Sequence, residues 1–128
     1  KYIHLNDELS MDAYYRTDHH WRQEALIPVA SHLLESMGRE TVFTAYELRT
    51  SPSFQGVYQG QLALPLEEET MRWLVDDTIE NAVRHNPVTN ETAPVYEADQ
   101  LDGVDPYRLF LGGNRPITEL KTENHESR

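Results

Sequence analysis

The apolar repeat between Ala25 and Met37 constrains the fold most strongly. Its apolar side chains recur at intervals of three and four residues, the period of one face of an α-helix. They are Ala25, Leu26, Val29, Ala30, Leu33, Leu34 and Met37. Gly38 follows directly and is typical of a helix C-terminus. Pro28 lies inside the pattern and lacks an N–H, so we expect either a kink there or a regular start delayed to about Ile27.

Short stretches elsewhere favour strands, because they alternate or are rich in β-branched and aromatic residues. They are residues 1–5, 41–48, 107–111 and 117–120, with one more near Val95. The composition of residues 49–60, with Pro52, Gly56 and Gly60, predicts a loop.

A second helix is predicted within about Pro65 to Arg84. Its apolar residues fit a helical period better than an alternating one. The acidic run Glu67 to Glu69 is expected to be a solvated face near the helix start, where the helix dipole favours it. The pattern as a whole predicts an α/β fold of short strands with two main helices, in one domain of 128 residues.

The charge balance limits the possible partners. The chain carries 22 acidic and 11 basic residues, a formal net charge of -11. Nucleic acid and anionic membrane surfaces are therefore poor partners. There is no cysteine, which excludes disulfides and thiolate metal sites. No apolar run reaches the length of a membrane span, so we expect no membrane insertion by this chain.

The segment from Tyr14 to Trp21 carries the densest set of chemical groups. If it is extended, Asp18 and His20 project to the same side. An aspartate beside a histidine can orient the ring and stabilise the imidazolium, which leaves the other ring nitrogen to act as a general base. We therefore predict Asp18 and His20 as catalytic residues. The alternative is a polar turn with incidental histidines and a packed Trp21.

The neighbours of this pair are candidates for the substrate approach. Tyr15, His19 and Trp21 are predicted to line it, with core packing of Tyr15 as the alternative. Asp18, His19 and His20 could instead be metal ligands, but adjacent residues rarely converge on one metal without further ligands. We expect no metal and no cofactor.

Two blocks carry a family resemblance. The string Arg16-Thr17-Asp18-His19-His20-Trp21 resembles the signature of the bacterial DHHW family, and residues 105–116 resemble its Asp-x-Tyr and Phe-Leu-Gly-Gly-Asn-x-Pro block. The Asp-x-His-Trp core is similar to that of SGNH-hydrolase-like O-acetyltransferases of the alginate acetylation type. The resemblance implies an incomplete SGNH-like three-layer unit in an extracytoplasmic or secreted protein. It also implies a carbohydrate or acyl-ester substrate.

The resemblance also assigns roles outside the Tyr14 to Trp21 segment. It implies that Gly113 and Asn114 donate hydrogen bonds to an oxyanion. A tight turn before the last strand is the alternative reading of these two residues. The family also has a Phe-x-Gly element, which Phe54-Gln55-Gly56 matches. It is interpreted as a packing turn, with substrate contact as the alternative.

No serine lies in the Asp-Ser turn that carries the nucleophile in related proteins. We therefore expect residues 1–128 to be a fragment of a longer protein, inactive alone, with the serine downstream. The predicted function is part of an O-acetyltransferase or esterase acting on cell-envelope carbohydrate. The alternative is a non-catalytic envelope or carbohydrate-binding module with a binding face of Tyr14, Tyr15, Tyr58 and Trp73.

Overall fold

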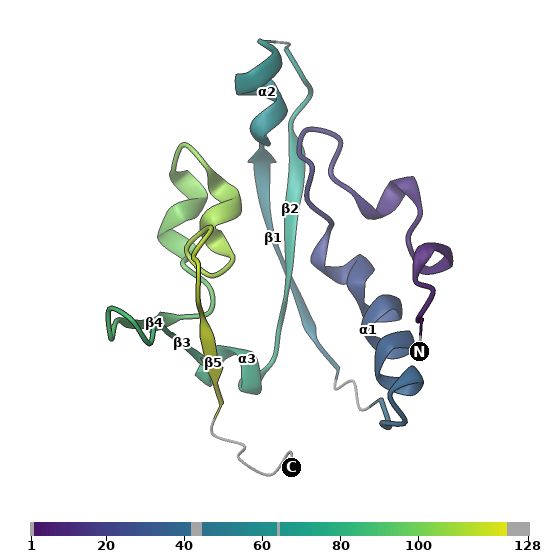
Figure 1. Ribbon diagram of the computed structural model, residues 1–128. Helices are drawn as coiled ribbons and strands as arrows, with labels where there is room; N and C mark the ends of the chain where they lie inside the picture. Colours follow the sequence, from purple (N-terminus) through teal and green to yellow (C-terminus); the bar gives the residue numbers. More distant parts are fainter. Residues whose placement is uncertain (1, 42–44, 64, 123–128) are drawn as a thin grey trace. The chain divides into compact units, whose positions relative to one another are not determined.

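The computed structural model describes residues 2–41, 45–63 and 65–122. The chain divides into two compact units, Lys1–Leu74 and Val75–Arg128. Figure 1 shows the order of the elements along the chain. Within the described ranges, every helix is too short or too polar to cross a membrane.

The first unit begins with irregular chain and short 3₁₀ helices. These lie at Asn6–Glu8, Met11–Ala13 and Gln23–Leu26. The strand predicted over residues 1–5 is wrong for residues 2–5, which have no regular structure, while residue 1 lies outside the described residues. Alternation alone does not make a strand, because its backbone groups need a pairing neighbour.

Helix α1, Ile27–Ser36, confirms the apolar repeat. It begins at Ile27 as predicted, with Pro28 in the first turn, where a missing N–H costs no hydrogen bond. Gly38 ends it with φ +71°. The Gly38 N–H donates to Glu35 O (2.9 Å) and the Arg39 N–H to Leu34 O (2.9 Å), the pattern of a glycine C-terminal cap.

Strands β1, Glu47–Phe54, and β2, Glu69–Val75, form a two-stranded antiparallel sheet. They run side by side in Figure 1, and helix α2, Val57–Leu62, follows the end of β1. The predicted loop at 49–60 is therefore wrong for most of its length. The strand predicted at 41–48 overlaps β1 only at Glu47 and Leu48, and its residues 42–44 lie outside the described residues.

The second main helix, predicted between Pro65 and Arg84, is wrong. That stretch holds β2, the short helix α3 at Asp77–Asn81 and strand β3 at Val83–His85. From Glu69 to Trp73, buried and exposed positions alternate. The prediction failed because the polar Glu69 occupies an inward position. The pattern of apolar residues therefore did not show the two-residue period of a strand.

The second unit contains α3 and a three-stranded antiparallel sheet in the order β4, β3, β5. β4 is Thr92–Pro94 and β5 is Glu119–Lys121, close to the strands predicted near Val95 and at 117–120. Asp76 caps α3 by accepting a hydrogen bond from the Ile79 N–H (2.8 Å).

The strand predicted at 107–111 is wrong. Residues Pro106–Leu109 form a 3₁₀ helix, and only Phe110 makes a β-bridge, with Tyr96. Pro106 fixes φ at a value that suits the first turn of a helix. Another 3₁₀ helix spans Ala98–Asp102. The fold is therefore mixed α/β with few helices and two small antiparallel sheets, and the SGNH-like three-layer arrangement stays a prediction.

Candidate functional site

The segment between Ala13 and Arg22 folds back on itself as a hairpin-like loop. Tyr14 and Trp21 form an antiparallel bridge, and the Arg22 N–H donates to Ala13 O at 2.7 Å. The Tyr15 N–H donates to His20 O at 3.2 Å. The intervening residues form the tip of this loop. The loop is bent, whereas the predicted placement of Asp18 and His20 on one side required an extended segment.

Asp18 and His20 are nevertheless in direct contact. Asp18 Oδ1 accepts a hydrogen bond from the His20 backbone N–H (3.0 Å) and lies 2.5 Å from His20 Nδ1. An aspartate side chain that bonds to the backbone two residues on is a local turn motif. This turn brings the two side chains together. The alternation of side chains along a strand, from which their proximity was predicted, does not. Their catalytic roles stay predictions.

The Asp18 carboxylate is buried and ionised. Its side chain is 0% exposed, and Oδ2 accepts a hydrogen bond from the Val57 N–H at the start of α2 (3.0 Å). Burial by itself raises the pKa of Asp18, but the hydrogen bonds from Val57 and His20 outweigh it and hold the pKa below its ordinary value. A carboxylate at His20 Nδ1 favours a proton there, so Nε2 is the nitrogen suited to act as a base.

Thr17 and Glu69 hold the loop that carries this pair. The two carboxylate oxygens of Glu69 accept hydrogen bonds from the Thr17 N–H (2.7 Å), the Thr17 hydroxyl (2.8 Å) and the Arg16 N–H (3.0 Å). Burial by itself raises the pKa of Glu69, but these hydrogen bonds outweigh burial and hold the pKa below its ordinary value. Glu69 is thus a buried residue of β2 that holds the loop by hydrogen bonds. The prediction that it belongs to a solvated face is wrong.

Gly56, between β1 and α2, lets this part of the chain approach the loop closely. A Cβ at this position would lie 2.3 Å from Thr17 O and 2.4 Å from Asp18 Cβ. Phe54, two residues earlier, is buried with its ring 4.8 Å from that of Tyr15. The Phe54-Gln55-Gly56 element therefore acts as a packing turn, as predicted, and it packs directly beneath Asp18.

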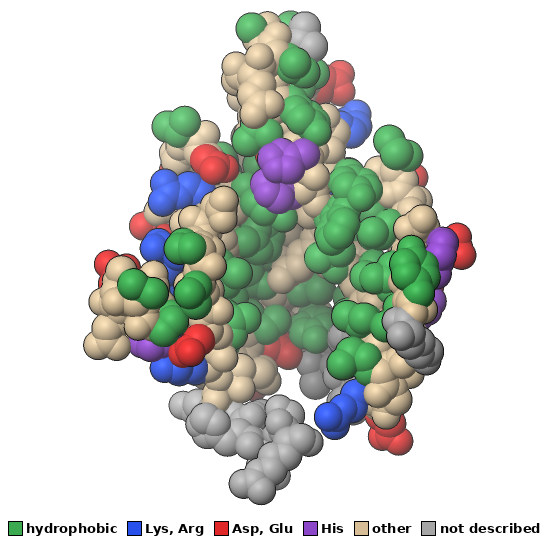
Figure 2. Space-filling view, in the orientation of Figure 1, with side chains coloured by type: hydrophobic (Ala, Val, Ile, Leu, Met, Phe, Trp, Pro, Cys, Tyr) green, Lys and Arg blue, Asp and Glu red, His purple; other side chains and the backbone are tan. Residues whose placement is uncertain are grey.

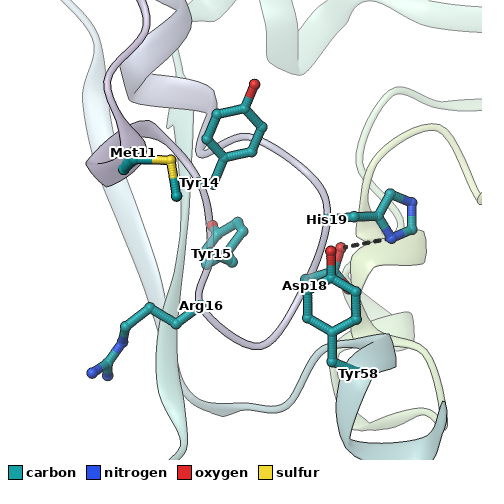
Figure 3. Close-up of a pocket in the computed structure, with 7 residues that line it drawn as sticks. All are labelled: Met11, Tyr14, Tyr15, Arg16, Asp18, His19 and Tyr58. Atoms are coloured by element: carbon teal, nitrogen blue, oxygen red, sulfur yellow. Dashed lines mark ion pairs between the residues drawn. The ribbon is translucent and has the colours of Figure 1, made fainter. Parts of the chain in front are cut away.

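His19 lies beside the pair at the surface. Its side chain is 55% exposed against 39% for His20, and the two rings stack at 4.0 Å between centroids. Figure 2 shows histidine side chains reaching the surface of the molecule. His19 Nδ1 is 3.7 Å from Asp18 Oδ1, the ion pair dashed in Figure 3.

Asp18, His19 and His20 also form a group that could hold a metal ion. Each offers one ligand atom, and these atoms lie within 4.8 Å of one another. A metal at Asp18 Oδ1 would compete with the bonds that this oxygen accepts from His20. The residues therefore form a hydrogen-bonded dyad as they stand. Metal binding would require them to rearrange.

A pocket of about 580 Å³ opens beside the pair. It is lined by Met11, Tyr14, Tyr15, Arg16, Asp18, His19 and Tyr58, drawn in Figure 3. Its walls are thus mainly aromatic, and Asp18 and His19 form one side. Sequence reasoning missed Met11 and Arg16, because nothing in the sequence brings them next to Tyr58.

The residues predicted to line the approach are placed differently from one another. Tyr15 forms the buried wall of the pocket; its hydroxyl accepts a hydrogen bond from the Arg72 N–H (3.1 Å), and burial raises its pKa to about 12. Trp21 is outside the residues that line the pocket and packs edge-on against Tyr14 at 5.9 Å. Trp73 is buried in β2, so its prediction as part of an exposed binding face is wrong.

Gly113 and Asn114 lie in the second unit. Gly112 and Gly113 have φ of +67° and +90°, the left-handed region that favours glycine. A Cβ on Gly112 would lie 2.6 Å from Glu97 Oε1, which pairs with Arg84. The backbone conformation of both glycines and the close contact at Gly112 therefore give a structural reason for glycine here. The oxyanion role of Gly113 and Asn114 stays a prediction.

Comparisons with known proteins relate this chain to a solved fold. No protein-family model and no curated protein matches the sequence. The fold is similar to the crystal structure of a DHHW family protein from Eubacterium siraeum, with a TM-score of 0.67 and 20% sequence identity. The match covers 91% of this chain and 42% of that protein. The chain thus shares its fold with part of a DHHW family protein, while the likeness to O-acetyltransferases stays a prediction.

Proposed function

We propose that the full-length protein is an SGNH-like O-acetyltransferase or esterase that acts on cell-envelope carbohydrate outside the cytoplasm. His20 is the general base and then the general acid, and Asp18 orients it. The single observation that carries the proposal is the 2.5 Å contact between the buried, ionised Asp18 and the partly exposed His20. The nucleophilic serine is supplied from outside residues 1–128.

In the proposed reaction, the serine oxygen attacks the acyl carbonyl carbon while His20 Nε2 takes the serine proton. The bond to the alcohol oxygen then breaks, and that oxygen takes the proton from His20 as it leaves. The acyl group stays on the serine. A water or sugar hydroxyl then attacks, gives its proton to His20, and releases the serine with that proton. The Asp18 carboxylate stabilises the imidazolium in both halves.

Substitution in the full-length protein tests these roles. We expect His20→Ala and Asp18→Asn to lower the turnover of p-nitrophenyl acetate by at least about 100-fold, since they remove the base or favour its wrong tautomer. His32→Gln is the matched control, because His32 lies in α1 and pairs with Glu8 (2.8 Å) away from the loop. Turnover by His20→Ala equal to that of the His32 control would discard the dyad.

A chelator separates the dyad from the metal alternative. Acyl transfer by Asp18 and His20 needs no metal, so dialysis against EDTA should leave the rate unchanged within about twofold. A rate that disappears with EDTA and returns with Zn²⁺ would assign Asp18, His19 and His20 as ligands instead.

A second candidate function is a non-catalytic carbohydrate-binding module. The aromatic pocket favours it, because Tyr14 and Tyr58 line a cavity large enough for a ligand. Carbohydrate binding by a full-length protein that has no esterase or acetyltransferase activity would support this function over catalysis.

A further inference from the structure

The pocket beside Asp18 is larger than acetyl transfer requires. An acetyl group has only two carbons, whereas the cavity is about 580 Å³ and is lined by three tyrosines. We propose that this pocket is a binding site for one or two neutral sugar rings. Its place next to the dyad makes it the acceptor subsite, a step that rests on the proposed function.

The walls of the pocket suit the faces of a sugar ring. Tyr14 and Tyr58 are half-buried and Tyr15 is buried, so each presents ring surface that is partly withdrawn from water. Aromatic walls with a few polar groups are typical of ligand sites, because apolar faces bind and polar groups orient. The C–H faces of a sugar can pack on such rings while its hydroxyls stay at their edges.

The hydroxyls at the pocket favour a sugar over an acyl chain. Within the described part of the chain, the Tyr14 and Tyr58 hydroxyls form no hydrogen bond. A sugar can bond to both. An acyl chain that covered them would remove them from water without a partner, which costs free energy.

The charges around the pocket favour a neutral ring. Asp18 is one of the lining residues, and its buried carboxylate has a pKa held below the ordinary value by hydrogen bonds that outweigh burial. It therefore places a negative charge beside the pocket at neutral pH. The Arg16 guanidinium extends away from the other lining residues in Figure 3 and pairs with Glu67 (4.0 Å) and Glu69 (3.6 Å). A sugar carboxylate would therefore be repelled by the Asp18 anion, while the Arg16 cation is already paired with two glutamates.

His19 connects the pocket to the dyad. Its ring lines the pocket, stacks on His20 at 4.0 Å and lies 6.3 Å from the Tyr58 ring. A ring held against Tyr58 and His19 is thus held beside the imidazole that would take a proton from its hydroxyl.

Titration of the 128-residue chain with cellobiose, followed by NMR chemical shifts, tests the proposal. We expect shifts at the pocket residues, and a Kd raised by at least about tenfold in Tyr58→Ala and by less in Tyr58→Phe, which keeps the ring. Tyr2→Ala is the matched control, because Tyr2 is 84% exposed and lies outside the pocket. It should change Kd by less than about twofold.

Two further ligands complete the test. Digalacturonic acid should bind more weakly than cellobiose, and hexanamide should not shift the pocket residues. The proposal is overturned if cellobiose does not bind, if Tyr58→Ala binds it as well as Tyr2→Ala, if the acidic sugar binds equally, or if hexanamide replaces it. Binding does not need the base, so cellobiose affinity in His20→Ala reports on the pocket separately from the dyad.

Discussion

Gly56 packs directly against Thr17 and Asp18. We expect Gly56→Ala to lower the free energy of unfolding by about 2–4 kcal/mol, because the new Cβ would overlap Thr17 O and Asp18 Cβ. Urea unfolding measures this. Gly60→Ala is the matched control: it lies in α2 with no atom within 4 Å of its Cβ, and alanine favours helices over glycine. Equal losses in the two variants would contradict the close approach.

The buried carboxylates also predict how stability depends on pH. The pKa values of Asp18 and Glu69 are lowered in the folded chain by hydrogen bonds that outweigh burial. The stability that they provide is therefore complete above their ordinary pKa values of about 4 and is lost as pH falls through the lowered folded values. Urea midpoints measured from pH 7 down to about pH 3 should fall steeply at the acid end.

Glu69→Gln isolates one of these groups. The amide keeps one acceptor oxygen in place of two, so we expect a loss of about 1–3 kcal/mol at pH 7 and a shallower fall in acid. Glu68→Gln is the matched control, since Glu68 is exposed and makes one long contact with Gln55 (3.5 Å). An acid slope in Glu69→Gln as steep as in the control would show that Glu69 does not support the loop.

At the scale of elements, β2 is the strand that the loop depends on. Met71 is 0% exposed and Thr70 is exposed, as strand alternation requires. Met71→Ala should cost about 2–5 kcal/mol through the cavity it leaves, whereas Thr70→Ala should cost less than about 1 kcal/mol. Thermal or urea unfolding of both variants measures the difference. Similar costs at the two positions would argue against the alternation.

At the scale of the whole molecule, the net charge of -11 is the dominant electrostatic feature. Acidic residues outnumber basic ones two to one, so repulsion between like charges exceeds the attraction of ion pairs at low salt. We expect Tm to rise when NaCl is raised from about 10 mM to about 150 mM, because the screening length falls from about 30 Å to about 8 Å. KCl should act equally, and a Tm that falls in either salt would contradict this balance.

The sequence by itself determined the features that depend only on residues close together in the chain. Helix α1, Ile27–Ser36, follows from the apolar repeat, from Pro28 in its first turn and from Gly38 just after its end. The contact between Asp18 and His20 joins residues two apart, although a turn produces it and not the strand assumed. Local geometry suffices for both, because every group involved lies within a few residues.

Only the tertiary structure decided the rest. β2 is a strand because β1 pairs with it, and Glu69 is buried because Thr17, 52 residues away, donates to it. The pocket unites Met11 and Tyr58. Strand pairing and polar burial depend on partners distant in sequence, and a pattern read along one segment carries no information about those partners.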